Sequence, residues 1–169
     1  MTTSTLLSSL FKYKSWANEE LFATMRTLDE TAHKDERHAA IRLLNHVYVV
    51  DRIFAAHLTG AKHGYAGANT ADTPRLEDLG EAVAASDRWY VDYVASVSPQ
   101  DLAETIEFTF TDGLPGRMSR EEMLAHVLTH GGYHRGAVGR ILSQLSVTVP
   151  RDIFTTYLHR HEPARRERS

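Results

Sequence analysis

Apolar residues recur every three or four positions along four stretches of the chain, which is the spacing of amphipathic helices with one buried face. The stretches cover approximately residues 4–28, 37–59, 76–97 and 119–145. Gly60 follows the second stretch as a stop signal, and Pro99 ends the third. Ser119 and Glu122 form a capping-box pattern at the start of the fourth. The pattern predicts an all-α protein, a four-helix bundle.

The connections between these stretches differ in kind. Residues 61–75 are rich in Gly, Asn, Thr, Asp and Pro, which predicts a surface connection. Residues 104–118 alternate strand-forming side chains and then turn at Asp112 and Gly113, which predicts a short hairpin or an extended crossover between the third and fourth helices. After Pro150, Asp152 is placed to cap a short C-terminal helix over residues 153–160. With no internal repeat and no second core pattern, we expect a single domain over residues 1–169.

Composition narrows the classes of function. The net charge of -3 and the pI near 6.4 argue against a nucleic-acid partner, which usually requires a basic face. The chain has no cysteine, which excludes disulfides, thiolate metal ligands and a cysteine nucleophile. It also has no long apolar run and no signal-peptide pattern at its start. We therefore expect a cytoplasmic protein that has no membrane span.

Three histidines stand four residues apart in the segment HVLTHGGYHRGAVGR, at His126, His130 and His134. At about 100° per residue, His134 lies within the apolar stripe of the fourth helix, His130 at its edge and His126 outside it. Two imidazoles at positions i and i+4 share one helix face and can reach one ion at about 2.0–2.1 Å. Two buried imidazoles need partners, and one metal ion serves both. Core histidines that hydrogen-bond to neighbours in a metal-free bundle remain the alternative.

A third ligand is expected from the second helix. His46 lies within the apolar stripe of that helix, whereas His57 lies three turns away, so that one ion cannot use both. Three neutral imidazoles leave open coordination positions, as in catalytic sites, and suit Zn, Ni, Fe or Co better than Mg or Ca. Gly131 and Gly132 indicate either close approach of another helix or a ligand, or merely tight helix packing.

These residues and their order resemble the DinB/YfiT-like superfamily of metal-dependent four-helix bundles. The resemblance rests on His46 in LLNHVYVVDRIF, on His130 and His134 in HVLTHGGYHRGAV, and on the first-helix segment YKSWANEELF. It implies that the three histidines bind one divalent metal and that the protein forms homodimers. The family name records induction by DNA damage in some members, which implies a role in stress response.

The resemblance also indicates a reaction class. Relatives include bacillithiol S-transferases and the mycothiol-dependent maleylpyruvate isomerase, which use a metal to activate the thiol of a small cofactor. The expected function is therefore a metal-dependent enzyme that activates a low-molecular-weight thiol or water for group transfer or hydrolysis of a small-molecule substrate. The alternative is a non-catalytic metal-binding dimer. Many members continue His-Arg-Gly-Gln, whereas this chain has Ala137 in the last position, so any contact of that glutamine is missing.

Six further residues are candidates to line the pocket or to support the ligands: Trp16, Asn18, Tyr48, Asp51, His126 and Arg135. Asp51 lies about 140° from His46 around the second helix, so we expect it to support a neighbouring helix rather than the metal. Arg135 either meets an anionic substrate or forms an ion pair at the surface or an interface. Trp16 is expected in the core, and Asn18 is expected to be exposed.

Overall fold

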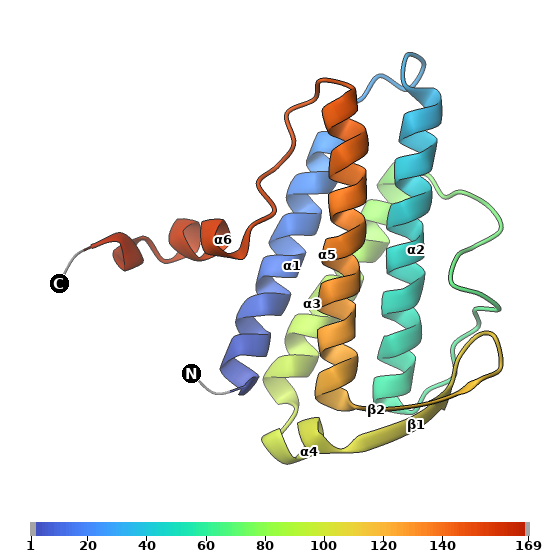
Figure 1. Cartoon of the computed structure of the whole chain (residues 1–169), viewed down its shortest axis with the longest axis vertical. Coiled ribbons are helices and arrows are strands. Elements are labelled where there is room, and N and C mark those ends of the chain that lie inside the picture. Colours follow the sequence, from blue (N-terminus) through green and yellow to red (C-terminus); the bar gives the residue numbers. More distant parts are fainter. Residues whose placement is uncertain (1–2, 168–169) are drawn as a thin grey trace.

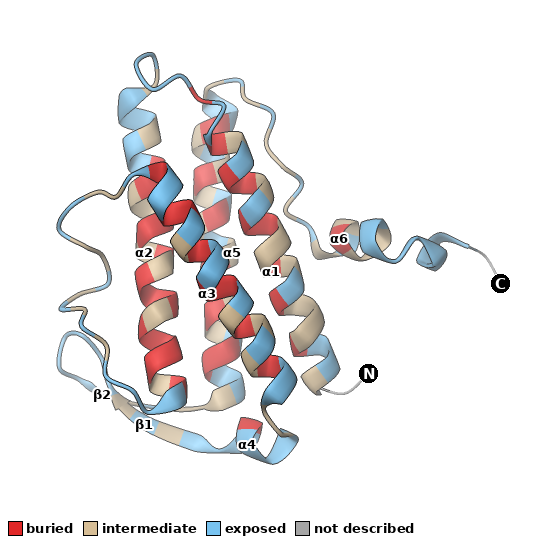
Figure 2. Ribbon diagram, turned by 180° about the vertical axis from the view of Figure 1, so that it is seen from behind, coloured by how far each residue is buried: buried red, intermediate tan, exposed pale blue. Residues whose placement is uncertain are grey.

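Four long helices lie side by side along most of the molecule in the computed structural model, which describes residues 3–167 (Figure 1). They are α1 (Thr3–Met25), α2 (Lys34–Thr59), α3 (Leu76–Ser96) and α5 (Arg120–Gln144). Helices α1 and α2 each pack against both α3 and α5. Buried residues gather on the sides of the helices that face one another (Figure 2). The four helical stretches predicted from the apolar spacing are therefore present, with ends shifted by a few residues.

The helix ends follow the local chemistry that the sequence indicates. The Ser119 hydroxyl accepts a hydrogen bond from the Glu122 N–H, and the Glu122 carboxylate accepts one from the Ser119 N–H, so the capping box that starts α5 is confirmed. Gly60 has a φ of 70°, a left-handed conformation that glycine adopts without strain. The N–H groups of Gly60 and Ala61 donate to the last carbonyls of α2, which therefore ends where predicted.

The connection between α3 and α5 contains a hairpin, which decides between the two alternatives. Strands β1 (Thr105–Thr109) and β2 (Pro115–Ser119) pair antiparallel and form the two-stranded sheet of the described residues. A short helix that the sequence analysis did not predict, α4 (Pro99–Ala103), precedes them, capped by Ser98 and Asp101. The hairpin and α4 lie at the end of the molecule where α2 ends and α5 begins (Figure 1).

The C-terminal segment forms the predicted short helix, α6 (Phe154–His161), followed by a 3-10 turn, η1 (Pro163–Arg166). This segment projects away from the four long helices (Figure 1). The predicted cap is wrong, since Ile153 holds the N-cap position and makes no capping side-chain hydrogen bond. The Asp152 carboxylate instead accepts hydrogen bonds from Arg135 and Tyr13, which removes it from the helix terminus.

The core consists of two apolar clusters with polar residues between them. One cluster joins the first half of α1 to the end of α2 and the start of α5, and the other joins the second half of α1 to the start of α2 and the end of α5. We call the residues between them the polar layer: Lys14, Asn18, His46, Asp51, Asp87, His130, His134 and Arg135. Across residues 3–167, no helix is both long and apolar enough to cross a membrane.

Candidate metal centre

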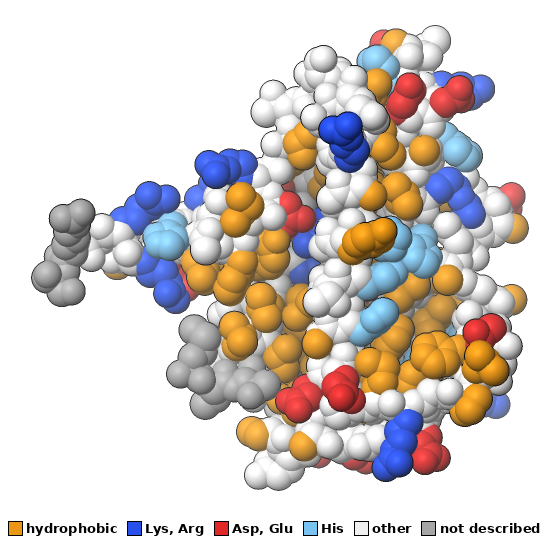
Figure 3. All heavy atoms as spheres, viewed as in Figure 1, with side chains coloured by type: hydrophobic (Ala, Val, Ile, Leu, Met, Phe, Trp, Pro, Cys, Tyr) orange, Lys and Arg blue, Asp and Glu red, His pale blue; other side chains and the backbone are white. Residues whose placement is uncertain are grey.

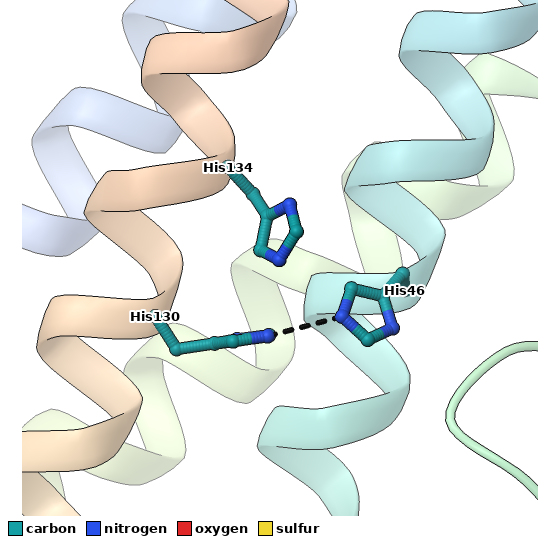
Figure 4. Close-up of side chains that lie close together, drawn as sticks. All are labelled: His46, His130 and His134. Carbon is teal, nitrogen blue, oxygen red and sulfur yellow. Dashed lines mark hydrogen bonds between the residues drawn. The ribbon is translucent and has the colours of Figure 1, made fainter.

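Three histidines from two helices converge at one edge of the polar layer. His46 projects from α2, and His130 and His134 project from successive turns of α5 (Figure 4). One ring nitrogen from each lies within 4.8 Å of the other two, and the Nε2 atoms of His46 and His130 are 3.0 Å apart. Two nitrogens bound to one tetrahedral ion are separated by about 3.3 Å. We call these three residues the histidine cluster; its geometry could hold a metal ion.

The cluster lies at the surface rather than in a sealed core. All three side chains are half-buried. Histidine side chains appear in the seam between α5 and α2 on the face of the molecule shown in Figure 3. A small molecule can therefore approach the cluster from solvent.

A backbone carbonyl orients the ring of His46. His46 Nδ1 lies 2.7 Å from the carbonyl oxygen of Ala68, in the connection between α2 and α3. A carbonyl accepts but cannot donate, so Nδ1 carries the proton and Nε2 keeps its lone pair towards the cluster. Hydrogen bonds of this kind fix the tautomer and the ring orientation of histidine ligands in metal sites.

Two of the three imidazoles, those of His130 and His134, lie in surroundings that favour the neutral ring. Burial, together with the neighbouring His134, His46 and His126, lowers the pKa of His130 to about 4. Burial and His46 also lower the pKa of His134. The Nδ1 atoms of His130 and His134 are buried, and no side chain or backbone group of the described residues hydrogen-bonds to them. Neutral histidines offer the lone pairs that metal binding requires.

His126 lies beside the cluster but not in it. Its ring stacks on His130 at a centroid distance of 5.3 Å and on Phe54 at 4.6 Å. It is not among the residues whose nitrogens converge. The sequence analysis likewise placed it outside the buried stripe.

Asn18 and Asp51 belong instead to a buried charge network around Lys14. The Lys14 ammonium lies 2.7 Å from Asp51 and also donates to Asp87. Asn18 donates to the second oxygen of Asp87 at 2.8 Å. Asp51 therefore supports α1, as expected, rather than the metal. The prediction that Asn18 is exposed is wrong, because its amide is needed to complete the hydrogen bonds of a buried carboxylate.

Arg135, Trp16 and Tyr48 have structural contacts of their own. Arg135 is buried and forms an ion pair with Asp152 at 2.7 Å, so the expected ion pair is present, between a buried guanidinium and a partly exposed carboxylate. The prediction that Trp16 lies in the core is wrong, since its side chain is half-buried and packs against Tyr157 of α6 at a centroid distance of 5.7 Å. Tyr48 packs at the margin of the second apolar cluster.

Lys14 and Asp87 were not predicted from the sequence, although Lys14 falls on the apolar face of α1 and a lysine there requires a buried partner. Gly131 and Gly132 differ in how closely other side chains approach them. A Cβ built on Gly131 lies 3.3 Å from the Arg135 guanidinium and 3.6 Å from Lys14 Cε, so this glycine permits close approach of α1. At Gly132 the nearest such atom is 3.9 Å away, in ordinary contact.

The fold and site define a mostly helical protein with a histidine cluster that could bind a metal. The model of the DinB family matches residues 1–167, and the chain belongs to that family. It is also similar to Protein DinB of Bacillus subtilis (strain 168), with 21% identity over 145 residues that cover 80% of this chain and 83% of that protein. The family resemblance drawn from the histidine spacing is thereby confirmed.

Proposed function

We propose that this protein is a metal-dependent enzyme in which His46, His130 and His134 hold one divalent transition metal. The reaction is group transfer or hydrolysis, with a small-molecule thiol or water activated as in thiol S-transferases. The observation that carries the proposal is a half-exposed cluster made of histidines alone, from two helices of a DinB family chain. In this proposal the four long helices form the four-helix bundle of one DinB-type domain over residues 1–169.

The donor set indicates the kind of ion. Three neutral imidazoles favour Zn, Ni, Fe or Co over Mg or Ca, which prefer oxygen ligands. Three protein ligands leave a position for a further molecule on a four-coordinate ion. A metal held there lowers the pKa of the thiol or water that it binds.

The residues of this chain supply orientation and an apolar boundary. The Ala68 carbonyl holds the His46 ring in the tautomer that points its lone pair at the cluster. The His126 ring stacks on His130, and Phe54 stacks on His126 in turn. Because the chain has no cysteine, the thiol must come from a separate molecule.

Metal analysis tests the site directly. Untagged protein and the variants His46→Ala, His130→Ala and His134→Ala are analysed by mass spectrometry, with His126→Ala as the matched control. We expect about one metal ion per chain in the wild type and the control, and loss in the three ligand variants. If the wild type binds no metal after incubation with Zn, Ni, Fe and Co, the enzyme proposal is overturned.

The proposed working form is a cytoplasmic homodimer that acts on a small-molecule substrate, without nucleic-acid or membrane partners. Light scattering of the untagged protein tests the dimer. Metal-loaded protein that turns over no combination of thiol and electrophile would favour the non-catalytic metal-binding dimer instead.

A further inference from the structure

A strip of rings extends from the histidine cluster towards the hairpin. We define this aromatic strip as His126, Phe54, His57, Phe108 and Phe110. The ring centroids of Phe54 lie 4.6 Å from His126 and 6.2 Å from Phe108, and Phe108 and Phe110 are 4.8 Å apart. These separations are typical of interacting aromatic rings, about 4.5–7 Å. Since His126 also stacks on His130, the strip is continuous with the cluster.

The strip reaches the surface on the same side of the molecule as the cluster. Figure 3 shows hydrophobic side chains filling the seam between the histidines and the hairpin. Phe110 is 44% exposed, and Phe108 and His126 are half-buried. Small-molecule sites combine apolar side chains that hold the ligand with a few polar groups that orient it, and the strip and the histidine cluster supply these two kinds of side chain.

The hairpin holds two of these rings in place through a glycine. Phe108 pairs with Gly116 across the two strands. A Cβ built on Gly116 would lie 2.5 Å from Phe108 Cζ and 2.8 Å from Phe110 Cε2. Both contacts are too short for a real side chain, so the glycine leaves the space that the two rings occupy. Because the contacted atoms are at the far ends of the rings, a larger residue would displace the rings rather than the backbone.

We propose that the aromatic strip binds a flat aromatic ring of the substrate, while the reactive group of that substrate lies at the histidine cluster. Phe108 and Phe110 then determine specificity. The proposal rests on the proposed metal-dependent function and adds the substrate class to it. Rings stack on rings or meet them edge to face, and the strip contains no lysine, arginine, aspartate or glutamate that could pair with an ionic group.

Three thiols that differ in one group test the proposal on cobalt-loaded protein. They are propane-1-thiol, 3-cyclohexylpropane-1-thiol and 3-phenylpropane-1-thiol, and sulfur-to-cobalt charge-transfer absorption reports binding at the metal. The cyclohexyl compound matches the phenyl compound in size but lacks a flat π face. We expect the phenyl compound to bind about three- to tenfold more tightly than the cyclohexyl compound, the range that aromatic pairs contribute beyond their area.

Variants of the hairpin locate the effect. Gly116→Ala and Phe110→Ala are expected to abolish the preference for phenyl over cyclohexyl and to leave the affinity for propane-1-thiol unchanged. Thr109→Ala is the matched control, since Thr109 is exposed and lies between Phe108 and Phe110 on the opposite face of β1. Thermal melts followed by circular dichroism check that each variant is folded.

The possible results distinguish failure of the aromatic subsite from failure of the proposed metal-dependent function on which the subsite rests. Equal affinities of wild-type protein for the phenyl and cyclohexyl compounds overturn the aromatic subsite and leave the metal and thiol proposal standing. A preference that survives in both hairpin variants also overturns it. If none of the three thiols gives a charge-transfer band, the proposed thiol activation is overturned, and the subsite with it.

Discussion

At the scale of single residues, the ammonium of Lys14 is held between two buried carboxylates. It is 1% exposed and lies against Asp51 and Asp87. Burial opposes its charge, but the two carboxylates outweigh burial and raise the pKa of Lys14. Burial raises the pKa of Asp51 to about 6, although the nearby charge of Lys14 acts to lower it. Each charge is therefore tolerated because its partners are in place.

Replacement of this lysine should be severe. Lys14→Met leaves two buried carboxylates without a counter-charge, and breaking a buried ion pair in this way costs about 3–5 kcal/mol of unfolding free energy at neutral pH. A carboxyl group whose pKa is raised by folding stabilises the folded state fully when the pH is below its pKa in the unfolded chain. This stabilisation is lost as the pH rises through its pKa in the folded state. Without Lys14 the pKa of Asp51 rises further above 6. The unfolding free energy lost in Lys14→Met should therefore become smaller as the pH is lowered.

Urea unfolding near neutral pH and again at about pH 5 measures both effects. Lys12→Met is the matched control, since Lys12 is an exposed lysine on the same helix. A loss in Lys14→Met no greater than that in the control, or a deficit that grows on acidification, would contradict this account of the network.

At the scale of elements, the connection between α2 and α3 supports the ring of His46. The buried amide of Asn45 donates to the side chains of Asn69 and Thr70. Asn69 donates in turn to the Arg42 carbonyl on α2. These bonds hold the segment that carries Ala68, whose carbonyl orients His46. The orientation of His46 thus depends on side chains that do not belong to the histidine cluster.

Asn45→Ala should therefore weaken metal binding although Asn45 is not a ligand. Loss of a group that orients a metal ligand typically reduces metal affinity about 10–100-fold. Competition titration against a chromophoric chelator measures this affinity, and Thr73→Ala serves as a control in the same connection. An unchanged affinity in Asn45→Ala would show that His46 is held by its own packing alone.

The connection between α2 and α3 illustrates which features can be predicted from the sequence and which cannot. Helix positions, the capping box at Ser119 and the stop at Gly60 depend on neighbouring residues, so the sequence predicts them well. The histidine cluster is also predictable, because one helix spacing supplies two members and one apolar stripe the third. The contact of the Ala68 carbonyl with His46 could not be predicted from the sequence, since every residue has a backbone carbonyl. The burial of Asn18 depends on the register of α1 against α3, which periodicity within one helix does not determine.

At the scale of the whole molecule, the polar layer is held between two packed apolar clusters. The helices that carry the three histidines, α2 and α5, are anchored in both clusters, above and below the histidines along their axes. Rigid elements hold a site more precisely than loops do. The two clusters therefore limit how far His46 can move relative to His130 when a ligand enters.

A metal that joins α2 to α5 should add to the stability of the whole chain. A ligand that binds the folded state alone, at a free concentration 100 times its dissociation constant, stabilises that state by about 2.7 kcal/mol. For a chain of this length, this corresponds to about 5–10 °C in melting temperature. Chelation should lower the melting temperature of metal-loaded protein by this amount, and added metal should restore it. Calorimetry of the wild type measures the shift.

The double variant His130→Ala/His134→Ala is the control, and chelator and metal should leave its melting temperature unchanged. It removes both α5 ligands from the edge of the polar layer but none of the buried residues of either apolar cluster. Equal melting temperatures of wild-type protein with and without metal would contradict a stabilising link between the helices. They would favour a bundle whose histidines are held by hydrogen bonds and ring contacts, such as the 3.0 Å contact between His46 and His130.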